Sequence, residues 1–239
     1  MASIFDYFRR SQNSNEPDSP TEAASAGLTG SSADDFIQVA QAAPAAEAQP
    51  IGNVESVTGS VTGTRADGSQ VELEAGSPVF QGDIIETGSD GAVGIVLADE
   101  TTFSMAENGS IVLDEMVYDP GTQDGSLSMS VVEGVFTFVS GQIAKTDPDA
   151  MTLDTPVATI GIRGTQVGIN VEGEGGGAQV VLMEEADGFV GEVVVQNEGG
   201  IQILNTAFQA TQVASFGTAP VQSFTMDKSQ LLNTFGDTL

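Results

Sequence analysis

The chain has 239 residues, of which 6 are basic and 34 acidic, so its net charge is −28. A surface of that charge repels nucleic acid phosphates and anionic lipid, and it favours basic partners. Cysteine and histidine are both absent, which excludes disulfides, thiolate chemistry and metal sites with Cys or His ligands. No stretch reaches the roughly 18 consecutive apolar residues of a membrane span. We therefore expect no nucleic acid partner and no transmembrane segment.

The N-terminal part of the chain is rich in Ser, Ala, Pro and acidic residues, and we predict that residues 1–50 form a disordered segment or linker. Within it, residues 1–10 are either a docking peptide or a frayed terminus. Residues 34–39 form a brief apolar island that either adds an edge strand or has no structure. The arginines near the start follow the apolar patch instead of preceding it, so we expect any export to proceed without a Sec signal peptide.

From residue 51 onward, short apolar runs alternate with turn signals at a spacing typical of all-β domains. We predict one all-β domain over residues 51–216, with many short, mostly antiparallel strands arranged as a β-sandwich or a solenoid-like meander. Asp67-Gly68 between alternating apolar segments predicts a hairpin. Val93, Ile95 and Leu97 share one face of a predicted strand. Aromatic residues are sparse, so the core should be aliphatic.

Two later segments carry further predictions. Residues 135–139 are apolar on both faces of a predicted strand, which is typical of a central strand. Residues 217–239 are predicted to be a tail with a short helix, for which Asp227 is a suitable N-cap. This mildly amphipathic tail is also a candidate export signal.

One of the six basic residues, Arg163, lies between Gly161 and Gly164. Apolar residues alternate on both sides of this group and predict two short strands, 157–159 and 167–171. Arg163 is either a contact for a partner's carboxylate or a buried or half-buried guanidinium paired within the domain. We favour the structural interpretation, in which removing a partner from a buried pair costs about 3–5 kcal/mol.

The acidic residues offer several candidate roles. Asp83, after Gly82, is interpreted as structural: it either caps a turn or pairs with Arg163. Loop carboxylates are candidate Ca²⁺ ligands, although they lack the spacing of an EF-hand and solvated side chains are the favoured interpretation. These carboxylates are Glu172, Glu174, Glu184, Glu185 and Asp187.

Three segments match the motifs of a known protein family. Residues 73–88, LEAGSPVFQGDIIETG, are similar to its opening motif around Gly-Asp, and residues 90–99, DGAVGIVLAD, are similar to the hairpin that follows. Residues 155–165, TPVATIGIRGT, are similar to its TPtatigvRGT signature. With these motifs the chain resembles the FecR-like family, and the resemblance covers roughly residues 52–215. The motif residues of this chain are Gly82, Asp83, Thr155, Pro156, Gly161, Arg163, Gly164 and Thr165.

The resemblance implies a β-strand domain, often periplasmic or extracellular, that works by protein contact. FecR-type regulators also have a cytoplasmic helical region that binds a sigma factor and one membrane span, and the sequence shows neither. The leaderless, acidic form looks more like FecR-like modules of proteins that type I systems secrete. The glycine-aspartate calcium repeats of those proteins are missing.

We expect no enzyme: there is no histidine base for a serine nucleophile and no phosphate loop, so no catalytic residue and no cofactor is predicted. A carboxylate-based hydrolase is a remote hypothesis. The preferred function is a structural or protein-interaction module of an exported bacterial protein, located outside the cell or on its surface. The alternative is a soluble signalling or regulatory module related to FecR-type regulators, which binds another protein by pairing strands with it. Its location would then be the cytoplasm.

Overall fold

The computed structural model describes residues 49–147, 149–173 and 175–239. The predicted disorder of residues 1–48, the docking peptide at residues 1–10 and the apolar island at residues 34–39 lie outside the described residues. The strands are β1 (Pro50–Thr58), β2 (Val61–Thr64), β3 (Gln70–Glu72), β4 (Pro78–Phe80), β5 (Ile84–Thr87), β6 (Ala92–Leu97), β7 (Thr102–Met105), β8 (Ser110–Tyr118), β9 (Gly125–Val139), β10 (Met151–Asp154), β11 (Thr159–Arg163), β12 (Gln166–Val171), β13 (Ala178–Met183), β14 (Glu192–Asn197), β15 (Gly200–Leu204), β16 (Gln209–Val213) and β17 (Phe224–Thr225). The helices are α2 (Gln142–Thr146), α3 (Lys228–Phe235) and the 3-10 helix η1 (Gly236–Thr238).

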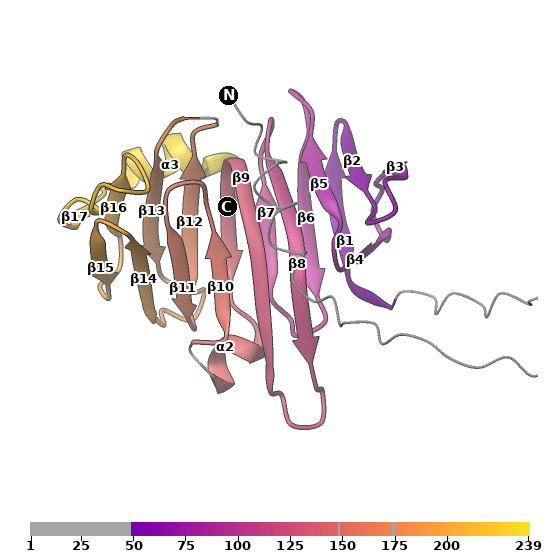
Figure 1. The fold of residues 1–239 in the computed structure, drawn as a ribbon, viewed down its shortest axis with the longest axis horizontal. Coiled ribbons are helices and arrows are strands. Elements are labelled where there is room, and N and C mark those ends of the chain that lie inside the picture. The colour runs from indigo at the N-terminus through magenta and orange to yellow at the C-terminus, as the bar shows by residue number, and fades with distance from the viewer. Residues whose placement is uncertain (1–48, 148, 174) are drawn as a thin grey trace, which may run out of the picture. The chain divides into compact units, whose positions relative to one another are not determined.

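The strands form one continuous sheet that folds into two layers (Figure 1). Layer A has the strand order β4-β1-β6-β7-β9-β12-β13-β16-β17. Layer B has the order β3-β2-β5-β8-β9-β10-β11-β14-β15. Among the described pairs, only β9 and β10 run parallel. The prediction of an all-β fold with mostly antiparallel strands is confirmed, and of the two arrangements considered it is the sandwich.

Strand β9 is the centre of the fold because it belongs to both layers. Its first half pairs with β8 and β10 in layer B, and its second half pairs with β7 and β12 in layer A. The strand changes layer at Gly134, which has a φ of 113°, a conformation that other residues rarely adopt. A Cβ at this position would also meet Gly109 Cα at 2.6 Å. The prediction that residues 135–139 lie in a central strand is confirmed.

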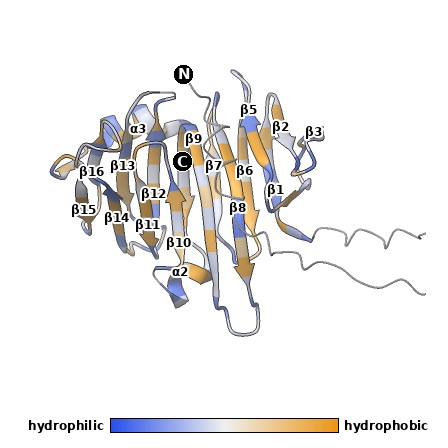
Figure 2. Ribbon diagram, viewed as in Figure 1, coloured by the Kyte–Doolittle hydropathy of each residue, from blue (hydrophilic) through white to orange (hydrophobic). Residues whose placement is uncertain are grey.

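The core lies between the layers and follows the alternation of the sequence. Val93, Ile95 and Leu97 of β6 are 1–3% exposed and point inward together, as predicted. The core is mostly aliphatic, with Phe103 and Phe138 in contact at a ring distance of 5.5 Å. Hydrophobic and hydrophilic residues accordingly alternate along the strands, and the loops are hydrophilic (Figure 2).

Strand β11 corrects the prediction for the segment around Arg163. We expected strands at residues 157–159 and 167–171, with a connection between them. The structure instead has a strand from Thr159 to Arg163, directly before β12. Ile160 and Ile162 supply its inward face and are fully buried. The outward positions are occupied by glycine and arginine, which are not typical of strands, so the apolar alternation of this strand was not recognised in the sequence.

Helix α2 was not predicted and depends on a distant carboxylate. Asp99, in the turn between β6 and β7, is completely buried. Its carboxylate accepts hydrogen bonds from Thr101 N (3.0 Å) and Thr101 Oγ1 (2.7 Å), and from Ile143 N (3.4 Å) at the start of α2. A carboxylate from another part of the chain thus satisfies the N-terminus of this short helix.

Helix α3 begins after Asp227, as predicted. The Asp227 carboxylate accepts from Gln230 N, and the Gln230 side chain accepts from Asp227 N, both at 2.9 Å, which is a capping box. The helix covers the outer face of layer A, where Leu231 and Phe235 pack with residues of β13 and β16. Burying two such side chains contributes about 1.5–3 kcal/mol each.

Candidate functional site

The first signature residues build the turn between β10 and β11. The Thr155 hydroxyl donates to Ala158 O (2.8 Å) and accepts from Ala158 N (3.0 Å), while Thr155 N also donates to Ala158 O (2.9 Å). Pro156 occupies the next position of this turn, where its fixed φ suits the bend. Thr155 and Pro156 therefore set the geometry of a hairpin.

The last signature residues carry the chain from layer B to layer A. Gly164 has a φ of 59°, which favours glycine. Thr165 is fully buried, with its N–H donating to Ser140 Oγ (2.7 Å) and its hydroxyl to Met183 O (3.2 Å). Gly164 and Thr165 thus connect β11 with β12 and join them to Ser140, directly after β9, and to Met183 of β13.

Arg163 points outward from the end of β11. Its Nε and Nη2 atoms contact Asp149 Oδ1 at 2.9 and 2.7 Å, and Nη1 donates to Glu192 Oε1 of β14. Hydrogen bonds to Asp149 and then to Glu192 raise the pKa of the guanidinium above its ordinary value. The side chain is 36% exposed and that of Asp149 is 72% exposed, so the ion pairs are largely solvated.

A shallow hollow lies beside this arginine, on the outer face of layer B. Its volume is about 190 Å³, and it forms because Gly161 has no side chain at the middle of β11. The nearest atom to a Cβ built at Gly161 would be Val194 Cβ at 3.9 Å. We call this feature the Arg163 hollow. Its lining residues are Asp149, Thr152, Thr159, Gly161, Arg163, Val194 and Gln196.

The other family motif lies in a different part of the domain and has its own arginine. Asp83 is 1% exposed, and its Oδ2 atom accepts from Phe80 N (2.8 Å) and from Arg65 Nη1. Arg65 also donates to Pro78 O (3.2 Å) and lies 4.7 Å from the centre of the Phe80 ring. The guessed pair between Asp83 and Arg163 is therefore wrong, since each residue has other partners.

Sequence reasoning did not single out Arg65 as a functional or structural residue. The signal was present, because a buried carboxylate needs a cation and the chain has few to offer. Arg65 directly follows β2, which pairs with β5, the strand that begins next to Asp83. Only this pairing brings the two side chains together.

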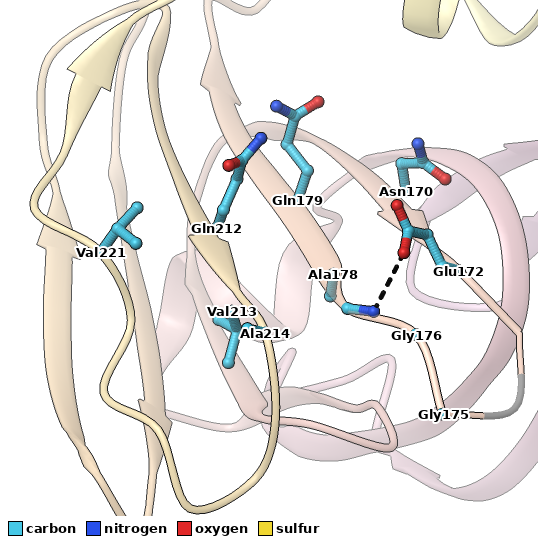
Figure 3. Close-up of a pocket in the computed structure, with 11 residues that line it drawn as sticks. Asn170, Glu172, Gly175, Gly176, Ala178, Gln179, Gln212, Val213, Ala214 and Val221 are labelled. Atoms are coloured by element: carbon cyan, nitrogen blue, oxygen red, sulfur yellow. Dashed lines mark hydrogen bonds between the residues drawn. The ribbon is translucent and has the colours of Figure 1, made fainter.

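A second depression lies on the outer face of layer A (Figure 3). It has a volume of about 410 Å³ and carries amide side chains from three neighbouring strands. We call it the amide depression. Its lining residues are Asn170, Glu172, Gly175, Gly176, Gly177, Ala178, Gln179, Gln212, Val213, Ala214 and Val221.

The loop carboxylates considered as calcium ligands are not gathered in the described part of the chain. No group of three or more Asp or Glu side chains suited to a metal ion occurs among residues 49–147, 149–173 and 175–239. Glu174 lies outside the described residues. In the same ranges, no helix is long and apolar enough to cross a membrane.

A comparison with family models identifies the class of the domain. Residues 83–186 match the family described as FecR protein. The chain thus carries a FecR-like segment, and the resemblance seen in the motifs is confirmed over a narrower range than the predicted 52–215. The match runs from Asp83 to the loop after β13. It supports a regulatory module of the FecR type.

Solved structures provide a more distant likeness. Two crystal structures of a candidate anti-sigma factor from Parabacteroides distasonis ATCC 8503, at 2.50 and 1.65 Å resolution, are each 12% identical to this chain. Their TM-scores are 0.47 and 0.45, and the match covers 62% of this chain and 62% of theirs. The chain thus spans less than two thirds of the structures it matches, and a likeness this distant carries no argument about function. No curated protein matches the chain.

Proposed function

We propose that the chain is a non-enzymatic, FecR-type regulatory module that binds another protein by adding a strand to the free edge of β15. The FecR match supports this regulatory alternative better than a structural role on the cell surface. The observation that carries the proposal is the apolar edge of layer B at β15, which no strand covers among the described residues.

The described strands at the edges of the two layers are β3, β4, β15 and β17, and three of these edge strands are too short to pair well with a partner's strand. Strands β3 and β4 have three residues each and β17 has two, whereas β15 has five. Natural proteins protect edge strands with short length, charge, proline or bulges. Strand β15, with the sequence GIQIL, has no charge and no proline. Its edge is the one that a partner's strand fits best.

The outward residues of β15 are unusually exposed for their type. Ile201 is 58% exposed and Ile203 is 43% exposed. In an antiparallel ladder only alternate residues bond to the neighbouring strand, and this hairpin closes at the pair Asn197–Gly200. The register therefore turns the backbone groups of Ile201 and Ile203 away from β14. The Ile203 carbonyl oxygen accepts instead from Gln202 Nε2 at 3.1 Å.

The edge is continuous with the Arg163 hollow. Ile203 lies opposite Val194, and Ile201 lies opposite Gln196, and both β14 residues line the hollow. A strand added at β15 would extend the same face that the family signature shapes. Strand β15 itself lies beyond the FecR-matched residues, so the family does not assign this contact.

The chemistry of the partner follows from charge. The chain carries a net charge of −28, and Glu198 is exposed in the turn that precedes β15. Like charge disfavours a second copy of this chain at the edge. A suitable partner segment is extended, with apolar residues at alternate positions to cover Ile201 and Ile203 and with basic residues flanking them.

The test places a photo-crosslinking amino acid at position 203 of the full chain in native cells. We expect a crosslink to one other polypeptide, mapped to a segment with alternating apolar and basic residues. The matched control carries the same probe at position 117, because Val117 is 56% exposed on another strand of layer B. Adding Ile201→Lys should abolish the crosslink at 203, since a positive charge would face the basic segment.

Three results would contradict the proposal. They are a crosslink between two copies of this chain, a pattern at position 203 that matches position 117, and a crosslink that persists undiminished with Ile201→Lys. Thermal unfolding of the Ile201→Lys chain keeps the last result interpretable. At this exposed position we expect a change in stability within about 0.5 kcal/mol.

A further inference from the structure

The amide depression contains three carboxamides that have no bond within the described part of the protein. Asn170, Gln179 and Gln212 form no side-chain hydrogen bond there, whereas the nearby Gln209 accepts from Asn205 N (2.9 Å) and Thr206 N (3.0 Å). Figure 3 shows the side chains of Gln179 and Gln212 pointing to the same side of the sheet. Their donors and acceptors are available to a ligand.

The three amides form a straight row because of the strand register. Asn170 of β12 lies opposite Gln179 of β13, which lies opposite Gln212 of β16. Neighbouring strands are about 4.8 Å apart, so the row presents one amide per strand over roughly 10 Å.

The lining excludes most other ligand classes. Among the described residues, Glu172 is its single charged residue and no lysine or arginine lines it, so a phosphate or carboxylate ligand would lack a counter-charge there. Ca²⁺ requires 6–8 oxygen ligands, which one carboxylate and scattered amides do not supply. The volume of about 410 Å³ lies in the range of small-molecule sites, roughly 300–1,000 Å³.

We propose that the amide depression binds a neutral, linear oligosaccharide lying across β12, β13 and β16. Each carboxamide both donates and accepts, which suits the paired hydroxyls of a sugar ring. One pyranose unit is about as long as the distance between neighbouring strands, so successive sugars meet successive amides. Glu172 adds an acceptor, and its carboxylate is held in place by Gly177 N at 3.3 Å.

The rest of the lining suits a weakly held glycan. Val221, which is 46% exposed, borders the depression opposite Glu172 and offers apolar contact to the C–H face of a sugar (Figure 3). Gly175 and Gly176 have no side chains that would block entry. No aromatic residue lines the site, so binding depends on hydrogen bonds. The site combines residues inside and outside the FecR-matched segment, since Gln212 lies beyond residue 186.

The test titrates the full chain with neutral trisaccharides of glucose, galactose, mannose and N-acetylglucosamine, followed by NMR of the side-chain amide groups. We expect saturable shifts of the Asn170, Gln179 and Gln212 NH₂ signals with at least one sugar at millimolar concentration. The variant with Gln179→Ala and Gln212→Ala, followed through the NH₂ signal of Asn170, should bind at least about tenfold more weakly, in line with lost hydrogen bonds to a ligand. The matched control is the variant Gln81→Ala, which removes an exposed glutamine that does not line the depression. This variant should bind the sugar as well as the unaltered chain does.

The proposal fails if none of these sugars shifts these NH₂ signals, or if the double variant binds as well as the unaltered chain. It also fails if an anionic sugar binds more tightly than its neutral counterpart. Unchanged thermal unfolding of the double variant ensures that weaker binding is not misfolding. Because the crosslinking test concerns β15, either proposal can fail without the other.

Discussion

Two arginines of this domain pair with carboxylates in opposite environments. Arg65 pairs with Asp83, whose side chain is 1% exposed, between the N-terminal strands of the sandwich. Arg163 pairs with Asp149 and Glu192 at a solvated edge of β11, with side chains 36%, 72% and 31% exposed. Both carboxylate–arginine groups involve a FecR motif residue, yet water surrounds only the second.

The difference separates a stability residue from a surface residue. A buried carboxylate loses its hydration and depends on its partner, whereas exposed pairs are worth about 0–1 kcal/mol because water competes with them. The arginine of the family signature is therefore not the one that stabilises the core. Arg163 is half-buried and paired within the domain at the rim of a hollow, whereas the buried carboxylate of Asp83 pairs with Arg65.

The largest expected effect follows from replacing Arg65. Arg65→Met keeps the apolar part of the side chain but leaves the Asp83 carboxylate buried without a cation. We expect a loss of about 3–5 kcal/mol in the free energy of unfolding, measured by urea denaturation. The matched control is Arg163→Met, the same change at the solvated site. Equal losses in the two variants would remove the distinction drawn above.

A smaller effect is expected at Arg163. Arg163→Met removes contacts with Asp149 and Glu192, each worth about 0–1 kcal/mol as a solvated pair. At about 1 M salt, where the Debye length is about 3 Å, the difference from the unaltered chain should nearly vanish. The loss in Arg65→Met should persist under the same conditions. A salt-independent loss at Arg163 would mean that this pair is as protected from water as the pair of Asp83.

The smallest expected effect on stability concerns a carboxylate, Asp114, that pairs with a hydroxyl and not with an arginine. Asp114 of β8 accepts from Ser130 Oγ (2.7 Å), and partial burial, with the nearby Asp154 charge, raises the pKa of its carboxyl. A raised folded-state pKa means that the folded chain binds this proton more tightly than the unfolded chain. Its contribution to stability is thus present at low pH and is lost as the pH rises through the folded-state pKa.

Asp114→Asn keeps an acceptor for Ser130 and removes the charge. The variant should match the unaltered chain in acid and be slightly more stable at neutral pH, as measured by thermal unfolding at several pH values. A variant that is less stable at neutral pH would show that the Asp114 charge is favourable where it lies. Such a result would place Asp114 with the paired carboxylates instead of apart from them.

Much of the local structure could be read from the sequence. The alternation Val93, Ile95, Leu97 predicted the inward face of β6, and the two-sided apolar run at residues 135–139 predicted the central position of β9. Asp227 predicted the start of α3 through capping chemistry. Each prediction rests on neighbours along the chain, where the two-residue period of a strand or the cap of a helix is visible.

The contacts between distant segments could not be read in the same way. Asp83 pairs with Arg65, which is 18 residues away in the sequence, and Arg163 pairs with Glu192, which is 29 residues away. These pairs depend on which strands become neighbours and in which register. Likewise, the row of Asn170, Gln179 and Gln212 exists only because β12, β13 and β16 align. One asparagine and two glutamines spread over about forty residues carry no local pattern that indicates a site.

The sequence by itself determined the strand period, the acidic charge, the FecR motifs and the absence of histidine and cysteine chemistry. Only the tertiary structure decided which motif residue is buried, which edge is left bare and where the depressions form. The physical reason is that alternation is set between adjacent residues, whereas burial and edge exposure are set by the layer that each strand joins. At Arg163 that choice of layer placed a paired guanidinium at the rim of an open face.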